Sequence, residues 1–279
     1  MEQTITCKNC KNRFIGKFCN QCGEKVYNEE NKKIRNIFGE VFHFVSHFDG
    51  TFLTSLKTSL TKPGKLSIDF CNGIRKKYFK PIPFFLLLVV LYLLFPKFKG
   101  LNMNAGTYVS EQYGFSWLSI PLFKAKMKKY GVTYEEIAHR YEGRSPKVSK
   151  FSLLLLIPLA AGVLALLNLN KRKPFYDHFI LAAEMISFFI FLQFLVVPFI
   201  SFLAEKVHPP SASLFYDGSW VDWVIQAISA LFVIIGVRNF YQEKYWLSIL
   251  KGLFFYFVFV VGIKYIYSLI VFLVTMLFI

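Results

Sequence analysis

Four cysteines near the start of the chain have the spacing of a metal site. Cys7, Cys10, Cys19 and Cys22 form the pattern C-x2-C-x8-C-x2-C. Each pair can aim two thiolates at one point, so the two pairs supply four sulfur ligands in the tetrahedral arrangement that zinc prefers. Because the protein fills all four positions, such a zinc ion would have a structural role.

Two disulfides or redox-active thiols are the alternatives to zinc. Disulfides persist in oxidising compartments, and the opening residues MEQTITCKNC lack the apolar stretch of a secretory signal. Zinc fits this spacing better, and the reduced thiols that it needs favour a cytosolic location for the ribbon. We expect a small hairpin over residues 14–18 to join the two Cys-x-x-Cys turns, with Gly23 in a left-handed conformation.

Three polar residues at the start of a long apolar stretch form a second candidate site. Asp177 and Glu184 share one face of the predicted helix, and His178 lies beside them, so two carboxylates can point into a helix bundle. Ionisable side chains within a membrane are costly and often functional. The alternative is structural: Asp177 and His178 cap the helix, and Glu184 pairs with a basic residue such as Lys251 or Lys264.

These candidates belong to a chain with the composition of a membrane protein. Hydrophobic residues make up 54% of it and aromatic residues 19%, whereas charged residues fall to 18%. Apolar stretches predict an all-α polytopic bundle of about five transmembrane helices. The predicted spans are residues 81–95, 151–169, 178–204, 221–237 and 246–279. The last stretch is long, and one tilted helix is favoured over a pair broken near residues 262–264.

The chain divides into three predicted parts. Residues 1–27 form the zinc ribbon, residues 28–80 form cytosolic amphipathic helices, and residues 81–279 form the transmembrane bundle with an extracytoplasmic helical loop at 97–150. Within the second part, apolar residues recur at helical spacing over 34–48 and 52–60, and Lys62-Pro63-Gly64 is a helix stop signal.

The charge of the chain is strongly positive, with 33 Lys and Arg against 17 Asp and Glu. Short basic segments at residues 75–80, 171–173 and 238–244 are predicted to be cytosolic, and residues 205–220, with a single Lys, extracytoplasmic. We therefore expect a multi-pass protein of the cytoplasmic (inner) membrane with a cytosolic N-terminus. Topology accounts for the charge, so nucleic-acid binding by the ribbon is the less favoured interpretation.

Two further segments carry a resemblance to a family. TKPGKLSIDFCNGIRKKYFKPIPFF at 61–85 and KRKPFYDHFILAAEMISFF at 171–189 follow the ribbon in an order that resembles polytopic bacterial membrane proteins with a domain of unknown function. The resemblance implies a membrane bundle with an N-terminal zinc ribbon and indicates no reaction. This chain has Asp177-His178 where that family usually has Glu-His, and Glu184 where a His often stands.

The sequence favours a membrane scaffold or adaptor without catalytic activity, whose ribbon docks a cytosolic protein or its own bundle. A transporter or lipid-handling protein that uses the polar residues of the third span is one alternative, and it requires a polar cavity. A membrane-embedded enzyme is another. The sequence contains no Walker loop, nucleophile elbow or zinc-protease helix.

Overall fold

The computed structural model describes residues 4–26, 50–93, 101, 103–207 and 220–279. It is mostly helical, which confirms a helical membrane bundle with a small N-terminal ribbon of four cysteines. Four helices within the described residues are long and apolar enough to cross a membrane: Tyr134–Leu167, Phe175–Ile200, Trp223–Tyr241 and Tyr245–Phe278. A shorter apolar helix is Pro81–Tyr92. The amphipathic helix predicted at 34–48 lies outside the described residues.

The described elements fall into two compact units. Unit 1 comprises Met1–Leu94 and Ile157–Tyr256, and unit 2 comprises Phe95–Leu156 and Phe257–Ile279. The elements, in chain order, are β1 (Ile5–Thr6), β2 (Arg13–Phe14), α2 (Thr51–Thr61), α3 (Lys65–Cys71), α4 (Pro81–Leu93), α5 (Ala105–Val109), α6 (Ser116–Tyr130), α7 (Tyr134–Ser152), α8 (Leu156–Leu167), α9 (Phe175–Ile190), α10 (Val197–Val207), α11 (Trp220–Tyr241), α12 (Tyr245–Gly262) and α13 (Ser268–Phe278).

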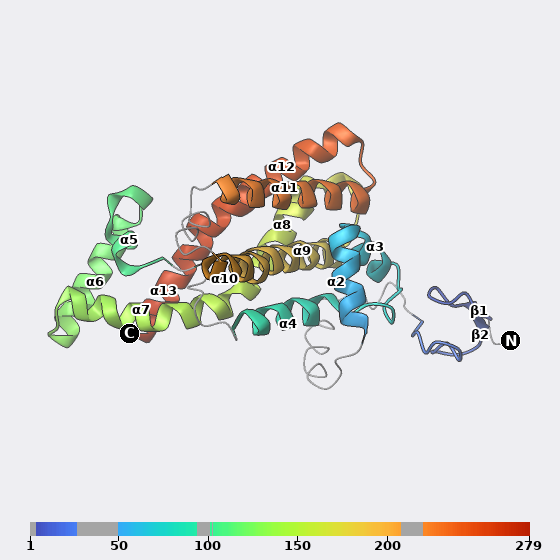
Figure 1. Cartoon of the computed structure of the whole chain (residues 1–279), viewed down its shortest axis with the longest axis horizontal. Helices are drawn as coiled ribbons and strands as arrows, with labels where there is room; N and C mark the ends of the chain where they lie inside the picture. The colour runs from blue at the N-terminus through green and yellow to red at the C-terminus, as the bar shows by residue number, and fades with distance from the viewer. Residues whose placement is uncertain (1–3, 27–49, 94–100, 102, 208–219) are drawn as a thin grey trace. The chain divides into compact units, whose positions relative to one another are not determined.

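Helix α9 is the centre of unit 1. Its most apolar window is 61% buried, against 39% or less for the other three long helices. Figure 1 shows α4 and α11 running beside α9, and α3 also packs on it. Because lipid would cover only the outer helices of such an arrangement, polar groups on α9 must find partners within the protein.

The turn between α2 and α3 packs closely against helix α11. Helix α2 ends at Thr61, as the Lys-Pro-Gly signal predicts, and Gly64 has a φ of 80°. A Cβ at Gly64 would lie 2.8 Å from the carbonyl oxygen of Gly236 on α11. The Asn239 side chain donates a hydrogen bond to the carbonyl oxygen of Pro63 at 2.9 Å. The main chain of the turn therefore lies directly against α11, which requires glycine at position 64.

Unit 2 has an aromatic core. Tyr108, Phe123, Tyr141 and Phe272 are buried together, and the rings of Tyr108 and Phe272 stack with centroids 4.6 Å apart. Helices α5, α6, α7 and α13, which Figure 1 labels, contribute one of these side chains each. Gly131, with a φ of 65°, ends α6 before α7 begins.

Two of the long helices have residues in both units. Tyr134–Leu167 and Tyr245–Phe278 are each 34 residues long. At about 1.5 Å per residue each is longer than the roughly 30 Å hydrocarbon layer. The predicted second span is thus the apolar half of a longer helix. The last apolar stretch is one continuous helix, with a π-helical segment at Ile263–Tyr267 where a break was the alternative.

Candidate functional site

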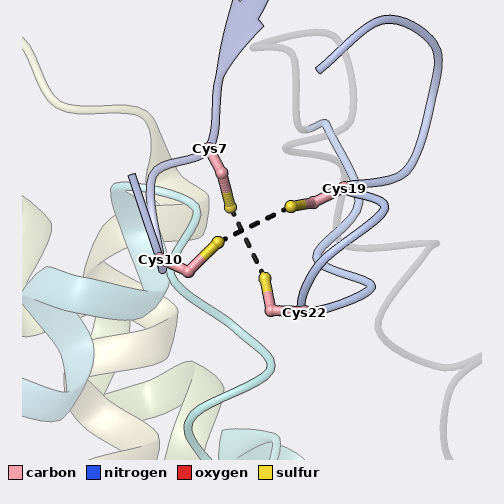
Figure 2. Close-up of side chains that lie close together, drawn as sticks. All are labelled: Cys7, Cys10, Cys19 and Cys22. Carbon is pink, nitrogen blue, oxygen red and sulfur yellow. Dashed lines mark hydrogen bonds between the residues drawn. The ribbon is translucent and has the colours of Figure 1, made fainter. Parts of the chain in front are cut away.

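The four cysteines of the ribbon converge on one point, as Figure 2 shows. The Sγ atoms of Cys7 and Cys22 are 3.6 Å apart, and so are those of Cys10 and Cys19; all four lie within 4.8 Å of one another. A disulfide bond is only about 2.05 Å long, whereas four sulfurs at about 2.3 Å from a tetrahedral metal ion are roughly 3.8 Å apart. The site therefore has the dimensions of a four-thiolate metal site rather than of two disulfides.

The two Cys-x-x-Cys turns, or knuckles, have the same backbone geometry. In the first, the N–H of Lys11 donates to the carbonyl oxygen of Cys7 at 3.0 Å; in the second, the N–H of Gly23 donates to that of Cys19 at 2.8 Å. Lys11 and Gly23 have φ values of 64° and 69°. The N–H of each leading cysteine donates to the carbonyl five residues later, at 2.8 Å in both knuckles. The ribbon is thus a structural repeat of one knuckle.

Ionisation is favoured at one thiol of the second knuckle, that of Cys19. Burial raises the pKa of the Cys19 thiol, but hydrogen bonds from the backbone N–H groups of Cys22 and Gln21 outweigh burial and lower this pKa to about 6. Because the thiolate is the form that binds metal, a lowered pKa prepares Cys19 as a ligand near neutral pH.

The strand pairs of the ribbon lie across the knuckles. β1 pairs with β2 across the first knuckle, and Phe18 forms a bridge with Lys25 across the second. The predicted hairpin over residues 14–18 is therefore wrong. Each knuckle draws the chain before it and the chain after it together, so residues 15–17 only connect one closed turn to the next.

The acidic residue Glu24 attaches the ribbon to the segment between α3 and α4. Glu24 is 6% exposed, and its Oε2 atom accepts hydrogen bonds from the backbone N–H groups of Arg75, at 3.0 Å, and Lys76, at 2.8 Å. Glu24 follows the second knuckle directly, so folding of the metal site fixes its position. We call this contact the ribbon latch. It holds the ribbon on the segment between α3 and α4.

The side chain of Arg75 connects this segment to the bundle. Its guanidinium donates to the hydroxyl of Tyr176 on α9 at 2.9 Å and to the carbonyl oxygen of Phe70 at 3.3 Å. The guanidinium carbon also lies 4.3 Å from the centre of the Phe70 ring, a cation–π distance. Arg75 is thus held by the ribbon through its backbone and by α9 through its side chain.

The Glu184 carboxylate binds the beginning of α3. Oε1 accepts a hydrogen bond from the N–H of Gly64 at 3.0 Å, and Oε2 accepts from the N–H of Ser67 at 2.9 Å and from its hydroxyl. Glu184 is 1% exposed. The first N–H groups of a helix have no partner within it, and a carboxylate satisfies them. The expected pairing of Glu184 with a lysine is therefore wrong, and Lys251 instead bonds to Asn168 and Glu243.

Asp177 and His178 are both buried at the start of α9. His178 Nδ1 lies 2.6 Å from the hydroxyl of Tyr241, and the two rings stack, so His178 connects α9 to α11. Asp177 is in the first turn of α9, where a negative charge interacts favourably with the helix dipole. The structure thus gives His178 and Glu184 different partners, and neither residue is bonded to the other.

The three basic segments predicted to be cytosolic are connected to one another in unit 1. Arg75 bonds to Tyr176, which follows the second segment, and Lys171 of that segment forms an ion pair with Glu243 in the third, at 3.2 Å. The segments therefore lie at the same end of the helices, as the positive-inside pattern requires.

Several residues that build these contacts were not predicted. Glu24 had a signal, because it is the sole acidic residue among residues 4–26. Asp69 accepts hydrogen bonds from Lys65 and from the Tyr78 hydroxyl, both at 2.7 Å, and steadies the segment that follows α3. Nothing in the sequence singled out Ser67 as a partner of Glu184 except its position in the first turn of α3.

Comparison with known proteins gives one match. Residues 49–93 match a family model described as protein of unknown function (DUF3667). This segment contains α2, α3 and α4 and includes the backbone N–H groups that Glu24 and Glu184 bind. The predicted resemblance to a family of unknown function is confirmed over it. Neither the curated proteins nor the solved structures gave a match.

Proposed function

We propose that the protein is a scaffold or adaptor of the cytoplasmic membrane, whose cytosolic zinc ribbon docks a protein partner. The observation that carries the proposal is the ribbon latch, in which Glu24 accepts from the N–H groups of Arg75 and Lys76. A ribbon held in this way is presented at a defined place just before the first apolar helix. A flexible tether alone would not orient it.

Zinc is the metal that the four-thiolate set favours. Soft thiolates in a closed tetrahedral set select zinc among the common structural ions, and no ligand position is left for a substrate. Among the described residues of the ribbon, the buried hydrophobic core consists of Phe14 with Cys7 and Cys19. Such a core is too small to fold alone, so the metal would supply the folding free energy.

The structural use of Glu184 supports a scaffold over a transporter. Each oxygen of its carboxylate accepts at least one hydrogen bond from α3, and the side chain is 1% exposed. A transport site needs polar groups that can reach a water-filled path. In this arrangement the carboxylate secures the DUF3667 segment to α9 instead.

The proposed orientation has the ribbon and the basic loops in the cytosol. The ion pair between Lys171 and Glu243 and the bond between Arg75 and Tyr176 group the three basic segments at one end. Positive segments are retained on the cytosolic side, so the ribbon that is latched beside them would lie there too. Reduced thiols in that compartment suit a zinc site.

Replacing Cys19 and Cys22 by Ser in the full chain tests this function. We expect the double variant to lose zinc and to lose the partner that crosslinks to the wild-type ribbon, while the helices still insert and fold. Cys71→Ser is the matched control, because it removes a buried thiol outside the metal set. Retention of every crosslinked partner by the double variant, or its failure to insert, would contradict a separable docking module.

A further inference from the structure

The ribbon exposes a basic and apolar patch that its own fold does not use. Ile15 and Phe18 are 55% and 59% exposed, although the buried core of the ribbon has a single aromatic residue. Arg13 and Lys17, within the same six residues of the chain, are exposed as well. We call these four side chains the tip patch. Residues 13–18, RFIGKF, contain no acidic residue, so the patch combines two positive charges with two large apolar side chains.

The tip patch lies next to the ribbon latch. Phe18 forms its bridge with Lys25, the residue after Glu24, and the carbonyl oxygen of Lys17 accepts from the N–H of Val26 at 2.9 Å. Glu24 in turn holds Lys76, and α4 begins at Pro81. Five residues span at most about 18 Å, so the ribbon latch is tethered within that distance of the apolar helix α4.

The chemistry of the patch matches a lipid surface. Lys and Arg side chains are attracted to anionic headgroups, and exposed Phe and Ile side chains partition into the boundary between headgroups and acyl chains. The bilayer is always within reach of a ribbon that is latched to a membrane-spanning chain, so its effective concentration is high.

We propose that the tip patch binds anionic phospholipid headgroups of the membrane that the chain spans. This inference goes beyond the adaptor role, because it uses a different surface. The exposed side chains of Lys8 and Lys11 on the first knuckle stay available to a protein partner when the tip contacts lipid. Lipid contact and the latch would then hold the ribbon at two points.

The test uses the full chain in nanodiscs, either of phosphatidylcholine alone or of phosphatidylcholine mixed with phosphatidylglycerol. Amide hydrogen exchange of residues 15–18 is measured in both. We expect exchange to be roughly fivefold slower in the anionic discs, and the difference to vanish in high salt because the attraction is electrostatic. The wild-type salt and lipid series tests the proposal even if a variant fails to fold.

Two paired variants localise the contact. Ile15→Ser with Phe18→Ser, and separately Arg13→Gln with Lys17→Gln, should abolish the slowing in anionic discs while the ribbon retains its metal. Lys8→Gln with Lys11→Gln removes the same charge from the first knuckle and should leave the slowing intact.

Three results would overturn the proposal. Equal exchange in the two kinds of disc would exclude lipid binding, and an equal loss in the first-knuckle control would mean that the attraction is spread over the ribbon. Slowing that needs an added cytosolic protein would identify a protein as the occupant. A different result would contradict the proposed adaptor function, namely that the double variant Cys19→Ser with Cys22→Ser keeps its crosslinked partners.

Discussion

Lys11 and Gly23 occupy equivalent positions in the two knuckles, and both have a left-handed backbone, with φ values of 64° and 69°. Glycine adopts this conformation without steric cost, whereas a lysine does not. The backbone of the first knuckle is therefore strained at Lys11, whereas that of the second knuckle is unstrained at Gly23. Both knuckles nevertheless make the same hydrogen bonds.

Replacing Lys11 by Gly should stabilise the ribbon. The left-handed conformation costs a non-glycine residue roughly 1–2 kcal/mol. The greater freedom of glycine in the unfolded chain offsets about 0.5–1 kcal/mol of the gain, which leaves a net stabilisation of about 0.5–1 kcal/mol. Competition with a metal chelator measures the effect. The Lys11→Gly variant should lose its metal more slowly, or to a smaller extent, than the wild type. Gly23→Ala is the opposite control, and it should weaken metal retention; the same response in both variants would contradict the argument from strain.

Removing the Glu24 carboxylate should release the ribbon without removing its metal. Glu24→Ala deletes the oxygen that accepts both hydrogen bonds of the ribbon latch, so amide exchange at Arg75 and Lys76 should rise by roughly tenfold or more. Glu24→Gln keeps one acceptor oxygen and should have an intermediate effect. Metal content should stay unchanged, because Glu24 is not a ligand. Unchanged exchange at both amides would show that the ribbon latch does not form in solution.

Replacing Glu184 should destabilise unit 1. Hydrogen bonds to a charged group contribute about 1.5–3 kcal/mol, and Glu184→Ala would leave the N–H groups of Gly64 and Ser67 buried without that partner. We expect a lower thermal midpoint in detergent, with Glu184→Gln between the wild type and Ala. Glu142→Gln, which removes an exposed carboxylate, is the matched control. A Glu184→Ala protein as stable as the control would rule out the structural role.

Substitution of Gly64 should also destabilise the protein. A Cβ at this position meets the carbonyl oxygen of Gly236 at 2.8 Å, and the φ of 80° is strained for any other residue. Gly64→Ala should therefore cost about 1–3 kcal/mol. Gly50→Ala is the control, since no atom lies within 4 Å of its added Cβ. Equal thermal midpoints for the two variants would contradict the close approach of the turn to α11.

Glu243 should give unit 1 an acid-sensitive contact. Burial raises the pKa of Glu243, but hydrogen bonds from Lys251 and Lys171 outweigh it, and the net pKa lies below the ordinary value. A lowered pKa means that stability is present above the ordinary pKa and is lost as the pH falls through the lowered one. The difference in thermal midpoint between wild type and Glu243→Gln should be constant above about pH 4.5 and shrink below it. A difference that is independent of pH would argue against ionisation.

The sequence predicted the class of fold and the clustering of the four cysteines because both depend on local patterns. Four cysteines at fixed spacing define a site by themselves, and apolar stretches define spans. The hydrogen-bond partners of Glu184 were not predictable in this way. Gly64 and Ser67 are more than a hundred residues away in the sequence, and they bind the carboxylate mostly through backbone N–H groups. Backbone donors leave no trace in the sequence, whereas the lysines that were expected to pair with Glu184 were conspicuous.

The end of α2 was predicted, because Lys62-Pro63-Gly64 is a stop signal, and Gly64 has a positive φ. The strand pairing of the ribbon was not predicted, because two residues per strand carry no periodic pattern. The sharing of the two long helices between units was not predicted either, since hydropathy marks the apolar half of a helix and is silent about its polar extension.

The short segment from Gly64 to Lys76 is held at both ends by carboxylates that accept hydrogen bonds from main-chain N–H groups. Glu184 binds one end and Glu24 binds the other. Recognition of the main chain leaves the side chain at position 76 open to mutational drift, as long as it is not proline, which has no N–H group. Across homologous sequences we therefore expect the acid at position 24 to persist while position 76 varies, so that the constraint would be visible in the residue that accepts the hydrogen bonds and not in the residue that donates them.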